Sequence, residues 1–252
     1  MMKFVESTAC VVMSVDCHVN EKFFDDWNDK SAYVFGYILT DGYINVDYSG
    51  NRLKNIKLEL TSKDYDLLSN VCKAMECAYK ISLTREFVAL NGNKTRHYHV
   101  QMFSKHMGEK LISLGAIQNK SKVVSFPVFI PDINMSDCIR GIFDGDGSVV
   151  VTDYKYCVCV TFCSGSELFL VGIRDYLHRV LDIYSEVRKR GKNVYTLVYY
   201  NNKVRAIYDF MYSGNLDVKL FLKRKYDRFK NYFKSSPDNP DTTSSLSRLV
   251  RQ

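Results

Sequence analysis

Two segments of the chain share one hydrophobic pattern. In residues 56–75 and again in residues 158–177, apolar and polar side chains first alternate, which is typical of a half-buried strand. After a polar residue, Ser62 or Ser164, apolar side chains recur at helical spacing. These helical positions are Leu68, Val71, Met75, Leu170, Ile173 and Leu177. Each segment is therefore predicted to be a strand followed by an amphipathic helix.

A second pair of segments extends the repeat. Residues 98–115 and 195–212 each read as a strand, a polar break and an amphipathic helix. The pattern predicts two halves, each with the order helix, strand, strand, helix, strand, strand, helix. We interpret this as a tandem duplication of an α+β unit, joined near residues 125–134, where two prolines interrupt regular structure.

The repeat divides the chain into four parts. Residues 1–22 are expected to be an N-terminal extension, residues 23–126 the first half and residues 127–234 the second half. The remaining residues, 235–252, are rich in Ser, Pro, Asp and Thr and are predicted to form a flexible tail.

A short motif begins each half: Val34–Gly42 reads VFGYILTDG and Ile139–Gly147 reads IRGIFDGDG. As helices, both motifs place small residues four positions apart on one face, where they allow close helix packing. These residues are Gly36, Thr40, Gly141 and Gly145. The other positions are mostly apolar, which is typical of a buried helix. We therefore expect the two helices to pack against each other at the junction between the halves.

Each motif ends in Asp-Gly. Gly42 and Gly147 are expected to end the helices in the left-handed conformation, which places Asp41 and Asp146 in the last turn. A carboxylate there lies at the negative end of the helix dipole, where a cation is preferred. Two such carboxylates side by side would be stabilised by protonation or by a divalent cation that binds hard oxygen ligands, such as Mg²⁺.

Two structural interpretations of the motifs are less favoured. A single Asp-Gly pair after a helix is ordinary turn chemistry, but two copies at matching places in a duplicated chain indicate a functional pair. The string DGDGS also resembles the start of a calcium-binding loop. That loop needs Glu at its twelfth position, where Lys155 stands.

Composition narrows the class of protein. The 252 residues contain no apolar run long enough for a transmembrane helix, and the first residues lack the pattern of a signal peptide. We expect an intracellular protein that does not bind membranes. The eight cysteines form no C-x-x-C pair and are expected to be free core residues. A net charge of +7 favours a polyanionic partner such as nucleic acid.

The two motifs and their flanks resemble the LAGLIDADG homing endonucleases of the single-chain, two-motif type, over residues 23–233. The flanks FFDDWNDKSAYVFGYILTDGYI, LGAIQNKSKVVSFPVFIP and LFLKRKYDRF are similar to the start of the first motif, as found in intron- and phage-encoded members, and to the close of each half. The resemblance implies an α+β fold, a pseudo-symmetric tandem duplication of αββαββα halves. Their strands would form a DNA-binding saddle, with the two signature helices packed at the seam.

The resemblance also implies roles for single residues. Asp41 and Asp146, at the penultimate signature positions, would be catalytic residues that hold Mg²⁺ or another divalent cation such as Mn²⁺. Lys120 and Lys225 follow their aspartates at equal distances along the chain and would be the catalytic basic residue of each site.

Two positions depart from the family pattern. The sixth signature position is Leu39 in the first motif and Asp144 in the second. Thr40 stands where a smaller Ala or Gly is usual, and we expect it to loosen the helix seam slightly.

The expected activity is site-specific double-strand cleavage of DNA at a long target site, by an intron-encoded monomer with one metal-dependent site per half. Strands within residues 43–60, 79–101, 148–162 and 184–200 are expected to lie along the major groove. The candidate DNA-binding residues are Arg52, Lys54, Lys57, Arg85, Lys94, Arg96, Lys155, Arg188, Arg190 and Lys192.

Two alternatives fit the same sequence. The fold could bind nucleic acid without cutting it, as an RNA maturase that acts on intron RNA or as a DNA-binding regulator. In a structural or interaction protein the motifs would serve helix packing alone. The basic residues of the strands argue against this last alternative.

Overall fold

The computed structural model describes residues 17–49, 52–88, 94–117, 122–152, 157–213 and 220–235. Most of the expected N-terminal extension and nearly all of the expected C-terminal tail lie outside the described residues. Both therefore stay predictions.

The order of elements repeats between the halves. The first half consists of α1 (Asp29–Asp41), β1 (Gly42–Ser49), β2 (Arg52–Ser62), α2 (Tyr65–Ala74), β3 (Ser82–Val88), β4 (Lys94–Phe103) and α3 (Lys105–Ser113). The second half consists of α4 (Asp132–Asp146), β5 (Gly147–Thr152), β6 (Cys157–Ser164), α5 (Glu167–Leu181), β7 (Val187–Gly191), β8 (Val194–Tyr200), α6 (Asn202–Tyr212) and α7 (Lys223–Ser235). This order confirms the predicted duplication, and α7 is an addition to the predicted pattern. None of these described helices has the length and apolar character that a membrane span needs.

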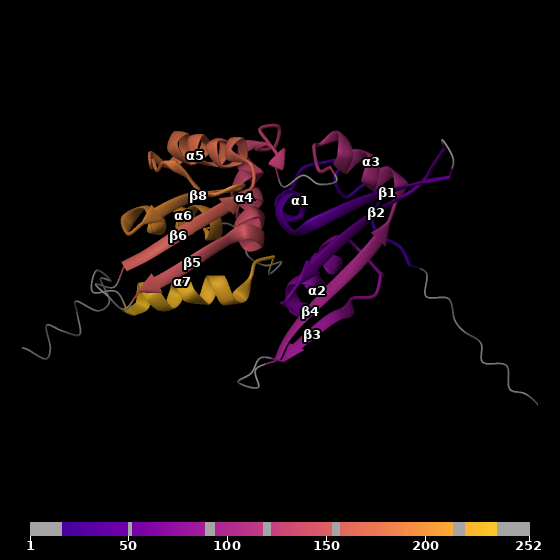
Figure 1. Ribbon diagram of the computed structural model, residues 1–252, viewed down its shortest axis with the longest axis horizontal. Coiled ribbons are helices and arrows are strands. Elements are labelled where there is room, and N and C mark those ends of the chain that lie inside the picture. The colour runs from indigo at the N-terminus through magenta and orange to yellow at the C-terminus, as the bar shows by residue number, and fades with distance from the viewer. Residues whose placement is uncertain are drawn as a thin grey trace, which may run out of the picture.

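The described strands of each half form one four-stranded antiparallel sheet, in the orders β1-β2-β4-β3 and β5-β6-β8-β7. In Figure 1 the two sheets lie on either side of α1 and α4. Gly42 lies opposite Leu60 in the first sheet, and Gly147 lies opposite Phe162 in the second. The residue after each motif aspartate therefore occupies the same place in its sheet.

Each sheet has one face covered by helices and one open face. In β6, the side chains of Val158, Val160 and Phe162 are buried, and those of Cys159 and Thr161 between them are half-buried. The helices α5 and α6 contact β6 and β8. Because side chains alternate along a strand, the buried positions face these helices and the others form the open face. The first sheet alternates in the same way beneath α2 and α3.

The cysteines follow this alternation. The described cysteines are all free, as expected, but of these only Cys72 and Cys138 are buried. The half-buried Cys157, Cys159 and Cys163 alternate with the buried residues of β6 and lie on its open face. The expectation that the cysteines are core residues is therefore wrong for this strand, because its thiols occupy the outward positions.

A capping box fixes the start of α1. Asn28 Oδ1 accepts hydrogen bonds from the main-chain N–H groups of Lys30 and Ser31, at 2.9 and 3.0 Å. The Ser31 hydroxyl oxygen accepts one from the main-chain N–H of Asn28 at 2.9 Å. Such a cap stabilises the first turn by about 1 kcal/mol. The helix then runs through the whole first motif to Asp41.

Helices α1 and α4 form the seam between the halves, as the motif spacing predicted. A Cβ atom added to Gly36 would overlap the main-chain oxygen of Cys138, and one added to Gly141 would overlap that of Tyr33. These glycines therefore let the two backbones touch. Further along, the side chain of Thr40 fills the space above Gly145, so the larger residue of one helix meets the smallest of the other.

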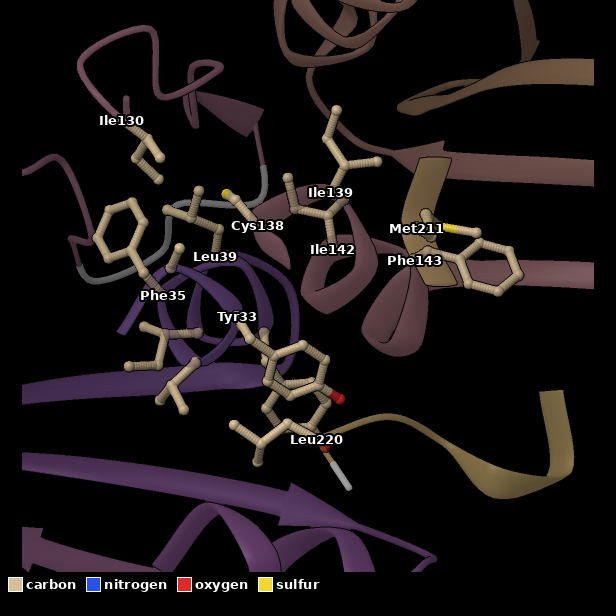
Figure 2. Close-up of a cluster of buried hydrophobic side chains, with 14 of the residues drawn as sticks. Tyr33, Phe35, Leu39, Ile130, Cys138, Ile139, Ile142, Phe143, Met211 and Leu220 are labelled. Atoms are coloured by element: carbon tan, nitrogen blue, oxygen red, sulfur yellow. The ribbon is translucent and has the colours of Figure 1, made fainter. Parts of the chain in front are cut away.

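Apolar side chains from both halves surround this seam. Phe35 and Leu39 of α1 lie in one cluster with Cys138 of α4, and Ile130 and Leu220 belong to the same cluster (Figure 2). All five side chains are buried. The halves therefore share a hydrophobic core, which fixes the ends of α1 and α4 relative to each other.

The glycines that follow the two helices do not have the predicted left-handed conformation. The φ angle is −83° at Gly42 and −87° at Gly147. The chain passes directly from helix into strand at both places. A Cβ atom at Gly42 would lie 2.7 Å from the main-chain oxygen of Ile38, and one at Gly147 would lie 2.5 Å from that of Phe143. Close approach of the backbone to the last helical turn, rather than positive φ, therefore requires glycine.

Candidate active site

Asp41 and Asp146 are the last residues of α1 and α4. Because Thr40 contacts Gly145, the packed helices bring the aspartates to the same end of the seam. Both carboxylates are close enough to act on one ammonium group, that of Lys225: burial lowers its pKa, and the charges of Asp41 and Asp146 are among those that oppose this effect. This placement agrees with the expected pairing of the motif aspartates, whose catalytic and metal-binding roles stay predictions.

Asp41 lines an open pocket of about 280 Å³. The lining residues are Tyr37, Asp41, Thr61, Ser62, Lys63, His97, Asp144, Gly145, Leu222 and Arg224. The Tyr37 hydroxyl donates a hydrogen bond to the main-chain oxygen of Thr61 at 2.7 Å, and burial, followed by the charge of Asp41, raises the pKa of Tyr37. Sequence reasoning missed His97 and Arg224 because they come from β4 and α7, and no local spacing connects them to the motif.

The end of α4 receives its counter-charge from α7. Neither α1 nor α4, both fully described, has a basic residue in its last turn. The Lys225 ammonium donates hydrogen bonds to the main-chain oxygens of Phe143 and Asp144, at 2.6 and 2.8 Å. It therefore compensates the negative end of the α4 dipole. Burial lowers the pKa of Lys225 to about 8, and the charge of Asp144 is the largest effect in the opposite direction.

The position of Lys225 differs from that expected of a basic residue next to the substrate. Lys225 is only 5% exposed, so its ammonium is held at the helix end rather than presented on the open surface. Its hydrogen bonds reach the last turn of α4, the helix that ends in Asp146. Its expected counterpart in the first half, Lys120, lies outside the described residues.

Asp144 is a buried carboxylate that joins three segments. Its Oδ2 accepts hydrogen bonds from the Tyr33 hydroxyl and from the main-chain N–H of Leu222, each at 2.8 Å. Its Oδ1 has no hydrogen-bond partner among the described residues. Burial raises the pKa of Asp144 to about 6. The charge of Lys225 is the largest of the effects that lower it. The sequence shows that the sixth signature position differs between the motifs, with Leu39 in the first and Asp144 in the second. It does not show which groups bind the Asp144 carboxylate.

Arg140, the second residue of its motif, ties α4 to α6 and to the segment before α7. Its guanidinium donates hydrogen bonds to the main-chain oxygens of Met211 and Leu220, at 2.7 and 3.0 Å. It also forms an ion pair of 2.7 Å with Asp137. The side chain is buried, so these partners satisfy a charge that would be costly to leave unpaired. Together with Asp144, Arg140 fixes the position from which α7 starts.

The expected DNA-binding residues of the first sheet occupy both faces. Lys57 and Arg85 lie on the open face, and Lys57 forms an ion pair of 3.3 Å with Glu59. Arg96 lies opposite Glu86 on the face that the helices cover, and the two form an ion pair of 2.6 Å. The position of Arg96 therefore favours a structural role over contact with a duplex on the open face.

The expected residues of the second sheet cluster on its edge strand. Arg188 lies opposite Thr196 on the open face, and Arg190 Nε donates a hydrogen bond to Thr196 Oγ1 at 3.4 Å. Lys192 lies in the turn between β7 and β8. The side chains of Arg52, Lys54 and Lys94 and the whole of Lys155 lie outside the described part of the chain.

The two motif carboxylates are the expected protein donors for a metal ion, and this role stays a prediction. Among the described residues, no three His, Cys, Asp or Glu side chains gather in a group that could hold a metal. Magnesium commonly takes one or two carboxylates and completes its shell with water and substrate phosphates. The hard oxygen donors of Asp41 and Asp146, at helix ends with no basic residue in the last turn, fit such an ion.

Comparison with known proteins covers part of the chain by sequence and most of it by structure. Residues 135–210 match the family model of the LAGLIDADG-like domain. No curated protein sequence matches the chain.

Solved structures are similar over both halves. The homing endonuclease I-WcaI bound to its DNA recognition sequence has a TM-score of 0.53 and 14% identity, and covers 81% of this chain and 89% of its own. A variant of I-DmoI with nicked target DNA, in the presence of 2 mM Mn, has a TM-score of 0.50 and 14% identity, and covers 74% of this chain and 97% of its own. The LAGLIDADG meganuclease I-AabMI bound to uncleaved DNA has a TM-score of 0.50 and 12% identity, and covers 89% of this chain and 92% of its own. The chain thus contains a LAGLIDADG-like domain at residues 135–210 and, across both halves, has the fold of the single-chain LAGLIDADG homing endonucleases.

Proposed function

We propose that this chain is a site-specific DNA endonuclease that cuts both strands of a duplex with the help of divalent metal ions. The observation that carries the proposal is the pairing of Asp41 and Asp146 at one end of the α1–α4 seam, between two sheets with open faces. A duplex laid along both open faces would pass over the seam. One carboxylate would then be available for each strand.

The aspartates are the residues that would hold the metal, as Mg²⁺ or Mn²⁺, together with water and DNA phosphates. Such an ion, when bound, supplies an activated water, neutralisation of phosphate charge and stabilisation of the leaving oxygen. Asp41 and Asp146 bring the negative charge that retains a cation next to a polyanion. Their fixed backbone positions, at the ends of packed helices, orient them before DNA arrives.

The buried groups behind the aspartates position the second site. Lys225 holds the last carbonyls of α4 and offsets the negative charge that gathers there. Asp144 and Arg140 keep the segment before α7 in place, so that Lys225 stays at the helix end. These residues would act through the position of Asp146 and would not touch the substrate.

The open faces would bind the duplex. Lys57 and Arg85 on the first sheet and Arg188 and Arg190 on the second offer positive charge to phosphates. The net charge of +7 supports binding whose affinity falls as salt rises, because each neutralised phosphate releases counterions. We include DNA as the partner and a single chain as the acting unit in this proposal.

The second candidate is a nucleic-acid-binding protein of the same fold that does not cut, as an RNA maturase or a DNA-binding regulator. One observation favours it: the Lys225 ammonium is buried against main-chain oxygens and does not lie on the open surface. Cleavage would then proceed without direct contact between Lys225 and the reacting phosphate.

Cleavage of a randomised duplex library distinguishes the two candidates. The wild-type chain with Mg²⁺ is expected to enrich one cut sequence, and Asp146→Asn is expected to bind that sequence without making a double-strand break. Asp182→Asn serves as the matched control, because this carboxylate is 99% exposed at the end of α5. Binding of the library without cleavage would favour the second candidate, and a lack of binding to any nucleic acid would overturn both.

A further inference from the structure

The open faces of the two sheets differ in chemistry. Within the described strands β5, β6 and β8 there is no Asp, Glu, Lys, Arg or His, whereas each strand of the first sheet contains a charged residue. The charged residues of the second sheet belong to the edge strand β7, which reads VRKRG. The two halves therefore share one arrangement of strands, but the charged residues described in the second sheet are confined to its edge strand.

Equivalent positions make the comparison direct. Because Gly42 and Leu60 correspond in register to Gly147 and Phe162, the outward positions of β1, β2 and β4 near these residues have counterparts in β5, β6 and β8. Four outward positions of the first sheet are Asn45, Lys57, Glu59 and Gln101. Their counterparts in the second sheet are Val150, Cys159, Thr161 and Val198. Amide and charged groups in one half thus correspond to methyl, thiol and hydroxyl groups in the other.

The polar face of the first sheet is rich in hydrogen-bonding groups. The Gln101 amide and the Lys57 ammonium both contact Oε2 of Glu59, at 2.8 and 3.3 Å. Donors and acceptors held in this way can bind the edges of bases in the major groove. The second sheet presents Val150, 43% exposed, between half-buried Cys159 and the strand edge.

The open face of β6 reaches the proposed cutting site. Cys163 lies on the same face of β6 as Cys159 and is close enough to Asp146 for the carboxylate to raise its thiol pKa, after the larger effect of burial. From Asp146 outward, the face therefore runs along β6 from Cys163 to Cys159. A duplex bound at Asp146 would cover it.

We propose that the second sheet recognises the 5-methyl groups of thymines in the major groove through Val150, Cys159 and Val198, while the first sheet reads its half-site by hydrogen bonds. This inference rests on the proposed function, because it requires a duplex on the open faces. It assigns different base chemistry to the two half-sites of one target.

Base chemistry gives the reason for the choice of thymine. The thymine methyl is the only methyl group that an unmodified base presents in the major groove. Contact with Val150 or Val198 removes this methyl from water. A G·C pair in the same place presents as many polar groups but no methyl group, so it lacks this gain.

Replacement of thymine by deoxyuridine tests the proposal, because it removes only the methyl group. The duplex is first selected from a randomised library by binding to the full chain, and its two half-sites are then substituted separately. In the half-site bound by the second sheet, each critical methyl is expected to contribute about fourfold to affinity, the value for burial of one methyl-sized group. In the other half-site, the substitution is expected to leave affinity unchanged within about twofold.

Two exchange variants connect the effect to the residues. Val150→Asn places the first-sheet residue in the second sheet, and Asn45→Val does the reverse at the equivalent position. Val150→Asn is expected to abolish the deoxyuridine effect at one base pair, which also shows which half-site this sheet covers, and Asn45→Val is expected to create a new one. Equal deoxyuridine effects in both half-sites, or a G·C-rich half-site at the positions that Val150→Asn alters, would overturn the inference while leaving DNA binding intact. Failure to select any duplex would instead overturn the proposed function and this inference with it.

Discussion

Lys225 Nζ lies 2.8 Å from the main-chain oxygen of Asp144, and this hydrogen bond joins the last helix of the chain to the end of the second motif helix. A second bond, of 2.6 Å, reaches the oxygen of Phe143. Both acceptors belong to the last turn of α4, which ends in Asp146. The negative end of this helix therefore holds two carboxylates and one buried ammonium, a balance that we expect to matter for stability and for the site.

Replacing this ammonium should destabilise the fold. Lys225→Met keeps most of the side-chain volume but removes one hydrogen-bond donor from each of two main-chain carbonyls and the counter-charge of Asp144. We expect a loss of about 2–4 kcal/mol in the free energy of unfolding, measured by urea denaturation at pH 7. Lys234→Met, at an exposed position of the same helix, should change it by less than about 0.5 kcal/mol. Equal losses for the two variants would contradict the capping role.

The hydrogen bond between Tyr33 and Asp144 should couple the two halves energetically. The hydroxyl and Oδ2 are 2.8 Å apart, and both side chains are buried. A double-mutant cycle with Tyr33→Phe and Asp144→Asn should give a coupling energy of about 1.5–3 kcal/mol, as for a hydrogen bond to a charged group. Independent effects of the two substitutions on unfolding would mean that the bond does not hold the halves together.

The seam between α1 and α4 should not tolerate added atoms. Gly141→Ala places a methyl group on the main-chain oxygen of Tyr33, so the helices must separate. We expect the free energy of unfolding to fall by more than about 3 kcal/mol, or the chain to fail to fold. A lower thermal midpoint would show this loss. Gly191→Ala is the control, because the nearest atom to its added Cβ lies 3.9 Å away. A similar midpoint for both variants would argue against close packing of the backbones.

Motif spacing was sufficient to predict the seam and the duplication. Small residues four positions apart report helix packing directly, and the structure places Gly36 and Gly141 against backbone. The role of Lys225 could not be read in the same way, because it depends on how α7 folds back onto α4. Left-handed caps were wrongly expected at Gly42 and Gly147, since an Asp-Gly sequence does not reveal that a strand starts at the glycine itself.

For the strands, too, the sequence predicted the local pattern but not the contacts between distant segments. Alternation correctly indicated that each strand has two faces, but not which basic residues share the open one. Arg96 lies on the covered face because it is an even number of residues from the buried Val100 and Met102 in β4, and the register of β3 places Glu86 opposite it. The sequence shows Asp144 only as a difference from Leu39 at the sixth signature position, and its partners Tyr33 and Leu222 come from distant segments.

Cys77 should be more reactive than an ordinary thiol near neutral pH. A hydrogen bond from Cys72 lowers the pKa of Cys77 to about 7, although burial acts in the opposite direction. Its alkylation by iodoacetamide should therefore reach half of its maximal rate near pH 7, against about 8.5 for a free thiol. Peptide mass spectrometry separates this site from the other cysteines. In Cys72→Ala the half-maximal pH should rise, and an unchanged profile would contradict the role of Cys72.

The most direct test of the account is strand-resolved cleavage of the selected duplex with Mg²⁺, in which each strand carries its own label. Wild type is expected to cut both strands. Asp41→Asn and Asp146→Asn should each bind the duplex at least as tightly, because a negative charge next to phosphates is removed, yet should yield no double-strand product. If either variant cuts both strands at the wild-type rate, the twin carboxylates at the helix ends are not the catalytic centre.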